Sequence, residues 1–218
     1  VEETSMADLG LEVGAALARI HAVTAGNSDV AARFDNKAQF HALRIEPYLL
    51  FTAERNPDAA DKMRQIAGGV TVTHIALMQG DISPKNILCG PDGPVFLDAE
   101  TVCYGDPAFD LAFCLNHLLL KGAWHARYAD ALAEAFAALK SAYFRNVGWE
   151  DHQGLDHRTA DLLAALLLAR VDGKSPVEYL AGERSRQFVR AQAKMLLKAE
   201  NLGLNAVIER WTAALKAA

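Results

Sequence analysis

The chain has 218 residues, 51% of them hydrophobic and 22% charged, and a formal net charge of −5. This composition fits one globular domain, residues 1–218, and excludes a disordered chain. The acidic balance and the lack of a basic stripe interleaved with aromatic residues argue against a nucleic-acid partner. No apolar run approaches the roughly 20 residues that cross a bilayer, and no signal peptide is recognisable, so we expect a cytoplasmic protein without a membrane partner.

The three cysteines, Cys89, Cys103 and Cys114, show no C-x-x-C spacing. An odd, scattered set of this kind predicts buried thiols in a reducing compartment rather than disulfides or a zinc site. The histidines include no H-x-x-x-H pair, so the sequence does not support a zinc-hydrolase site.

Apolar residues at a spacing of three to four predict helices in the first third of the chain. Ser5 is the expected N-cap of the first helix, and residues 24–29 are expected to form a loop. Pro47 should kink or restart the second helix, and Gly68–Gly69 should end the third. These helices are predicted over residues 5–24, 37–55 and 59–67.

Residues 72–104 form the one β-like region, with short strands predicted at 75–78, 87–89 and 95–98. Residues 90–93 read Gly-Pro-Asp-Gly and predict a hairpin turn between the last two strands. The remainder of the chain is predicted to be helical. Its helices are expected over residues 107–120, 124–139, 155–171, 183–200 and 204–215, with a short piece at 176–181. The predicted fold class is therefore mainly α with a small β-hairpin or sheet.

The β-like region carries the residues with the clearest chemical pattern. Asp81 follows the first apolar run, Asn86 comes five residues later, and Asp98 ends the last short strand. An aspartate, an asparagine at +5 and an aspartate at +17 suit a phosphotransferase that holds Mg²⁺ and orients a hydroxyl. Amide and carboxylate oxygens are the hard ligands that Mg²⁺ prefers, while the remaining carboxylate accepts the proton of the hydroxyl.

Three motifs in order, Gln79-Gly-Asp-Ile-Ser-Pro-Lys-Asn86, Leu97-Asp-Ala-Glu100 and Gly105-Asp-Pro-Ala-Phe-Asp-Leu111, resemble the aminoglycoside phosphotransferase and choline kinase-like family. The resemblance extends over the chain and begins with a leading helix that ends near His21. It implies a protein-kinase-like C-terminal, helical lobe. It also implies transfer of the γ-phosphoryl group of ATP, with Mg²⁺, to the hydroxyl of a small acceptor such as an aminoglycoside, a choline-like amino alcohol or a sugar.

The same resemblance assigns roles to individual residues. Asp81 is implied to be the catalytic aspartate, with Asn86 and Asp98 as ligands of nucleotide-bound Mg²⁺. Glu100, two residues after Asp98, would face the same way on a strand end and join the shell of a second metal. The implied structural supports are Gln79 for the loop, Asp110 for the loop backbone, and Asp106 with Pro107 for the start of the next helix.

The sequence departs from the family pattern in two places. Gln79 stands where the family usually has His, which is expected to tune the loop without disabling it. The chain begins at Val1, in what resembles the first helix of the C-terminal lobe, and contains no glycine-rich loop with a strand lysine. We therefore expect a fragment that lacks the N-terminal nucleotide lobe, or receives it from a partner chain, and that is inactive alone.

Other interpretations remain open at this stage. Asp81 and Asn86 could form an ordinary polar turn, and Lys85 could either neutralise the transferred phosphate or be a plain surface lysine. His117 is expected to be a structural or surface residue, whereas Arg170 is either a junction residue or one that reaches the cleft. The alternative function is a non-catalytic binding or scaffold domain. A protein kinase is disfavoured because no Ala-Pro-Glu segment follows Asp98.

Overall fold

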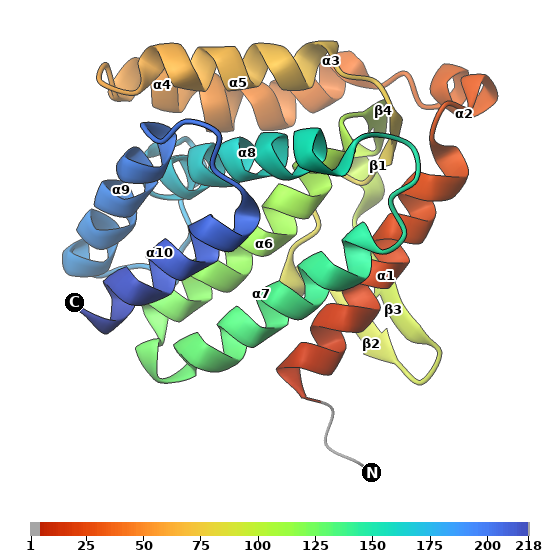
Figure 1. Ribbon diagram of the computed structural model, residues 1–218. Helices are drawn as coiled ribbons and strands as arrows, with labels where there is room; N and C mark the ends of the chain where they lie inside the picture. Colours follow the sequence, from red (N-terminus) through yellow and green to blue (C-terminus); the bar gives the residue numbers. More distant parts are fainter. Residues whose placement is uncertain (1–4, 218) are drawn as a thin grey trace.

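Helices make up most of this protein, which we describe from a computed structural model over residues 5–217 (Figure 1). None of the helices within this range is long and apolar enough to span a membrane. The helices are α1 (Met6–Thr24), α2 (Ser28–Arg33), α3 (Lys37–Phe40), a π-helix (His41–Leu50), α4 (Phe51–Arg55), α5 (Ala60–Val72), α6 (Pro107–Trp124), α7 (Ala129–Phe144), α8 (His152–Asp172), α9 (Glu183–Leu197) and α10 (Leu204–Lys216).

Four short strands form two separate two-stranded antiparallel sheets. Strand β1 (Ala76–Met78) pairs with β4 (Cys103–Gly105), which the sequence analysis did not identify as a strand. Strand β2 (Ile87–Gly90) pairs with β3 (Gly93–Phe96) as the predicted hairpin, and Gly93 adopts a φ of 101° at its turn. The mainly α fold class with small antiparallel sheets is thus confirmed.

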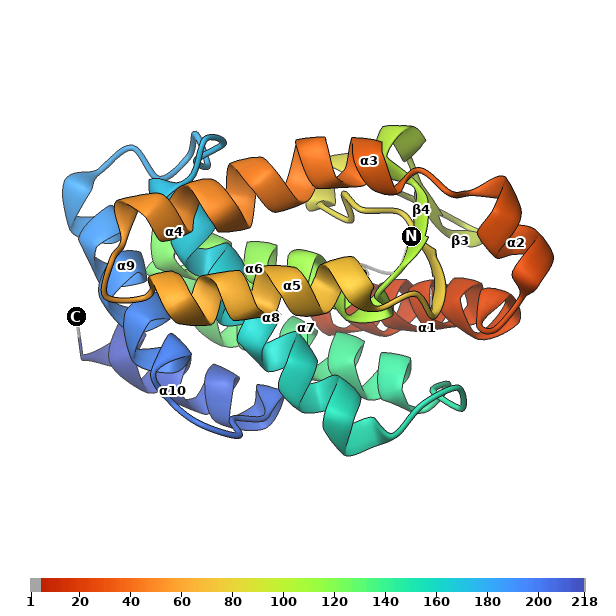
Figure 2. The ribbon, with the colours of Figure 1, turned by 90° about the horizontal axis from the view of Figure 1, so that it is seen from above.

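The core is organised around α6 and α8, which lie between two layers of helices (Figures 1 and 2). On one side run the continuous segment α3–π–α4 and its neighbour α5, which lie side by side when the molecule is viewed from above (Figure 2). Helices α7, α9 and α10 lie on the other side. The run Leu162–Leu168 in α8 is buried throughout, because a helix covered on both sides by other helices has no solvent face.

Helix α1 begins as predicted at Ser5, which forms a capping box with Asp8. It lies against α7 over most of its length (Figure 1). The contact is unusually close, because a Cβ atom placed on Gly10 would meet the carbonyl oxygen of Ala135 at 2.5 Å. Gly14 faces the carbonyl of Leu139 in the same way. The Gly10-x-x-x-Gly14 pattern is therefore a helix-crossing site, not a phosphate-binding loop.

The structure excludes one of the two alternatives given for Pro47 and shows that the predicted end of α5 was wrong. Pro47 does not restart the helix, because the chain passes through it in a π-helical segment, whose wider register accommodates the missing N–H. The α5 helix does not end at Gly68–Gly69 but continues to Val72. Burial of Ile66 and Val70 on either side of the two glycines outweighs their low helix propensity.

Smaller differences concern segments between the long helices. Helix α2 begins within the predicted 24–29 loop and extends beyond it to Arg33, with Asn27 as its N-cap. Trp124 ends α6 rather than beginning the next helix, and residues 176–181 contain no regular element. Cys89 is exposed, so the expectation of a buried thiol is wrong there, because β2 belongs to a hairpin in which Leu88, Cys89 and Gly90 are all exposed to solvent.

Candidate functional site

The loop that begins at Gln79 is held by α6 through one carboxylate. Asp110 Oδ2 accepts a hydrogen bond from the Gln79 amide at 2.7 Å, and Asp110 Oδ1 accepts one from the Gly80 amide at 2.7 Å. Gly80 has a φ of 80°, and a Cβ atom there would meet the side chain of Thr101, so the loop requires glycine at this turn. The structure thus places Asp110 where the sequence analysis expected it, beneath the backbone of the loop.

Asp110 is itself supported by two buried side chains that the sequence analysis gave no role. His21 Nε2, at the end of α1, lies 3.3 Å from Asp110 Oδ2. His21 Nδ1 lies 2.6 Å from the hydroxyl of Tyr143, in α7. All three residues are fully buried. A histidine on the apolar face of the first helix was the available sequence signal for this support.

Gln79 connects the loop to the segment that carries Asp98. Its Oε1 accepts a hydrogen bond from the Asp81 amide at 2.6 Å. Its Nε2 donates to the carbonyl oxygens of Leu97 at 2.6 Å and Asp98 at 2.8 Å. One amide side chain therefore fixes the spacing between the two predicted functional segments, which is what a loop support at this position should do.

Asp81 is largely buried, and its carboxylate faces two cations. Arg44 Nη2 lies 3.3 Å and Lys85 Nζ 3.9 Å from Asp81 Oδ2. Burial raises the pKa of Asp81 above its usual value, while the charges of Arg44 and then Lys85 lower it, and that of Asp98 contributes a further rise. Arg44 also donates to the Gly80 carbonyl at 2.7 Å.

Arg44 is a site residue that the sequence analysis missed. It comes from the π-helical segment, 36 residues before Gly80, and is 7% exposed. An arginine within the buried face of a helix was the available signal, since such a charge requires a partner.

Asn86 and Asp98 present oxygen atoms near Asp81. Asn86 is buried, and its Nδ2 donates to the Asp81 carbonyl at 3.2 Å, which leaves Oδ1 as a free acceptor. The Asn86 carbonyl accepts from the Leu97 amide at 2.8 Å, one residue before Asp98. Asp98 is exposed and lies two residues beyond the end of β3. Its backbone adopts the left-handed conformation, with a φ of 62°. The structure therefore brings Asp81, Asn86 and Asp98 into one region.

This donor set fits a magnesium ion that also binds phosphate oxygens. One amide oxygen and one carboxylate are suitable hard ligands, but they cannot enclose the ion alone. Within residues 5–217 no group of three His, Cys, Asp or Glu side chains could hold a metal. The arrangement thus suits a metal that arrives with a nucleotide, in contrast to a site built entirely from protein ligands.

The argument for Glu100 from strand alternation is wrong. The strand ends at Phe96, and Glu100 lies in a 3₁₀ turn over Ala99–Thr101, so it does not share a strand face with Asp98. Glu100 is exposed, and its carbonyl oxygen accepts a hydrogen bond from Gln39 Nε2 at 2.8 Å. Its assignment to a metal shell thus loses its geometric basis.

Asp106 opens α6 as expected. Its side chain accepts a hydrogen bond from the Ala108 amide at 3.0 Å, with Pro107 in the first turn. The structure adds a bidentate partner, because Arg158 donates to both oxygens of this buried carboxylate at 2.9 and 3.1 Å. Arg158 also pairs with Glu150 at 2.7 Å, so α8 and the segment before it are fixed to the start of α6.

Comparison with known families agrees with this arrangement. Residues 6–155, more than half of the chain, match the phosphotransferase enzyme family. The matched range contains the loop at Asp81, the β2–β3 hairpin with Asn86 and Asp98 on either side of it, and the supporting helices α1, α6 and α7. The chain belongs to this phosphotransferase family. No curated protein matches it.

Proposed function

We propose that this chain is the acceptor-binding and metal-binding lobe of a small-molecule kinase that transfers the γ-phosphoryl group of ATP to a hydroxyl. It would correspond to the C-terminal, helical lobe of a protein-kinase-like fold. The observation that carries the proposal is the convergence of Asp81, Asn86 and Asp98 around one loop, with Gln79 and Asp110 fixing the backbone between them.

In this proposal Asp81 orients the acceptor hydroxyl and accepts its proton. Its carboxylate is held by Arg44 at 3.3 Å, and its backbone amide is held by Gln79 at 2.6 Å. Fixing a general base in this way lowers the entropic cost of reaching the reactive geometry. Lys85 is largely exposed and 3.9 Å from Asp81, where its charge can stabilise a phosphoryl group in transfer.

Asn86 Oδ1 and the Asp98 carboxylate would hold Mg²⁺, which supplies charge neutralisation for the phosphate oxygens. The protein's own contribution is to present these two oxygens from a fixed loop and a fixed turn. The Gln79 bonds to the Leu97 and Asp98 carbonyls maintain that turn.

The hairpin beside these ligands offers an apolar surface that suits a purine ring. Leu88 and Val95 are direct cross-strand partners, and each is 57% exposed. Exposed apolar side chains next to a polar site are typical of a surface that a ligand or another part of a protein covers. We propose that a nucleotide lobe, on the same chain or a partner chain, closes over this hairpin and that residues 1–218 alone bind ATP weakly.

The test uses the full-length protein and measures ADP release with a panel of hydroxyl acceptors. Asp81→Asn and Asp98→Asn are each expected to lower kcat by about three orders of magnitude or more, since both groups act in the transition state. Asp61→Asn, in the exposed first turn of α5, is the matched control and should leave kcat unchanged. Undiminished turnover in either site variant would refute the assignment, and ADP release absent throughout would favour a binding or scaffold domain.

A further inference from the structure

A set of buried polar atoms near the catalytic loop has no hydrogen-bond partner. Within residues 5–217 these atoms include Ser83 Oγ, His117 Nε2 and Arg170 Nε. Ser83 follows Asp81 by two residues and is 2% exposed, and His117 is 6% exposed. Buried polar groups are normally paired, so unused donors beside a proposed active site point to a polar ligand.

Arg170 is connected to Asp81 through the Tyr48 ring and Arg44. The guanidinium carbons of Arg44 and Arg170 lie 5.8 and 5.4 Å from the centroid of the Tyr48 ring. Arg170 also donates to the Tyr48 hydroxyl at 3.0 Å. Since Arg44 contacts the Asp81 carboxylate at 3.3 Å, Arg170 belongs to the same local cluster.

His117 and Lys121 meet at Tyr179. His117 is linked to Tyr48 through the Phe113 ring, whose centroid lies 5.9 Å from that of Tyr48 and 5.4 Å from that of His117. His117 Nδ1 lies 3.3 Å from the Tyr179 hydroxyl, and Lys121 Nζ lies 5.1 Å from the centroid of the Tyr179 ring. His117 and Lys121 are four residues apart on α6, which also carries Asp110 two turns before His117. Asp110, His117 and Lys121 therefore lie on the same face of α6.

Among the residues that the structure describes, two cations of this cluster, Arg170 and Lys121, are not paired with an acid. Across the described range, neither Arg170 nor Lys121 has a carboxylate within ion-pair distance. Burial, then the charges of Arg170, Lys121 and Lys85, lowers the pKa of His117 to about 3, and no carboxylate is among the causes. A cationic ligand would be repelled here, whereas an anion would gain charge-assisted hydrogen bonds.

We propose that Ser83, His117, Lys121 and Arg170 bind an anionic group, a carboxylate or a phosphate, on the acceptor. This deepens the proposed function and rests on it. The acceptor is then a hydroxy acid or a phosphorylated polyol, and cationic amino alcohols and aminoglycosides are poor substrates. The anionic group anchors the acceptor at Arg170, while its hydroxyl faces Asp81.

The experiment measures anion binding by the chain in the absence of nucleotide. The NMR signals of the His117 imidazole, assigned with His117→Gln, are followed during titration with inorganic phosphate, acetate and tetramethylammonium. A shift with phosphate alone identifies a phosphorylated acceptor, and a shift with acetate as well identifies a carboxylate. A shift of the His117 signals with tetramethylammonium overturns the proposal. The absence of a shift with both phosphate and acetate overturns it as well.

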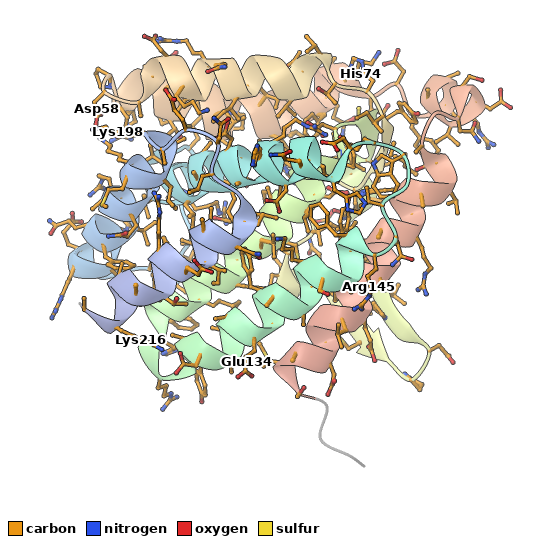
Figure 3. All side chains as sticks on the ribbon, viewed as in Figure 1. Asp58, His74, Glu134, Arg145, Lys198 and Lys216 are labelled. Atoms are coloured by element: carbon orange, nitrogen blue, oxygen red, sulfur yellow. The ribbon has the colours of Figure 1, made fainter. Side chains whose placement is uncertain are left out.

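Charge-removing variants show whether the predicted residues form the site. Arg170→Gln and Lys121→Gln should each weaken anion binding about tenfold, the loss of one charge-assisted contact. Arg145→Gln and Lys216→Gln remove exposed charges elsewhere on the molecule (Figure 3) and should bind as the unmodified chain does. If either glutamine variant fails to fold, Arg170→Lys and Lys121→Arg, which keep the charge but change the donor geometry, should still bind the anion, and loss of binding in both would overturn the proposal.

These outcomes are separable from those of the kinase proposal. Equal weakening in the control variants, or none in the site variants, overturns the anion site. If ADP release still depends on Asp81 while the anion site fails, the kinase proposal stands and the acceptor is not anionic. If the anion site holds and no ADP is released, the kinase proposal fails instead.

Discussion

His21 Nε2 lies 3.3 Å from Asp110 Oδ2, although 89 residues separate them, and both side chains are fully buried. The Asp110 carboxylate can only accept a hydrogen bond from His21 Nε2, whereas the Tyr143 hydroxyl can donate one to His21 Nδ1. The geometry therefore assigns the imidazole proton to Nε2. The chain Tyr143–His21–Asp110 then ends on the amides of Gln79 and Gly80. Three helices thereby fix the backbone of the loop that carries Asp81.

Replacing Asp110 with asparagine should destabilise the fold. Both carboxylate oxygens accept from backbone amides, so an asparagine would direct its NH₂ group toward one of these donors. We expect the free energy of unfolding to fall by about 3 kcal/mol, as for other broken buried polar networks. Urea unfolding followed by circular dichroism measures this. Asp130→Asn, in an exposed pair with Lys216, is the control and should change stability by under about 0.5 kcal/mol. Equal stability of the two variants would contradict the network.

The close contact of α1 with α7 gives a matched pair of glycine substitutions. Gly14→Ala places a methyl group against the backbone carbonyl of Leu139, so the helices must separate, and we expect a loss of about 2–3 kcal/mol in the free energy of unfolding. Gly68→Ala lies on the exposed side of α5 with no atom within 4 Å of the added methyl. It should gain about 0.5–1 kcal/mol from the lower entropy of the unfolded chain. Opposite signs in thermal or urea unfolding support the crossing; a neutral Gly14→Ala argues against it.

The sequence allowed the long helices and the hairpin to be predicted because apolar spacing and turn residues are local signals. The roles of Gln79 and Asp110 as loop supports were anticipated from the resemblance to the phosphotransferase family, whose motifs place them in order. Helix continuity through Pro47 and through Gly68–Gly69 was not predictable, because it depends on burial against α8 and its neighbours. The contacts of Arg44, His21 and Tyr143 join distant segments, and no single-sequence signal encodes such pairings.

The three cysteines should differ sharply in reactivity. Cys89 is exposed, whereas Cys103 and Cys114 are buried. Burial raises the pKa of Cys103 and raises that of Cys114 to about 12, which suppresses the reactive thiolate of both. Titration of the native protein with a disulfide reagent near pH 8 should therefore show one fast thiol, and three after denaturation. Cys89→Ser should abolish the fast phase; a second fast thiol in the native protein would show that a buried cysteine is accessible.

The pH dependence of catalysis offers a direct test of the contact between Arg44 and Asp81. Because Asp81, as the proposed general base, must be deprotonated to accept a proton, kcat/KM should rise with pH through its pKa, which burial raises above the usual value. The Arg44 charge lowers that pKa, so Arg44→Gln should move the acid limb of the pH–rate profile of the full-length protein to higher pH. Arg55→Gln, an exposed cation at the end of the same helical segment, should leave the limb in place. Removal of Asp81 itself eliminates the limb together with most of the turnover. An acid limb that stays fixed, or moves to lower pH, in Arg44→Gln would mean that Arg44 does not act on the general base.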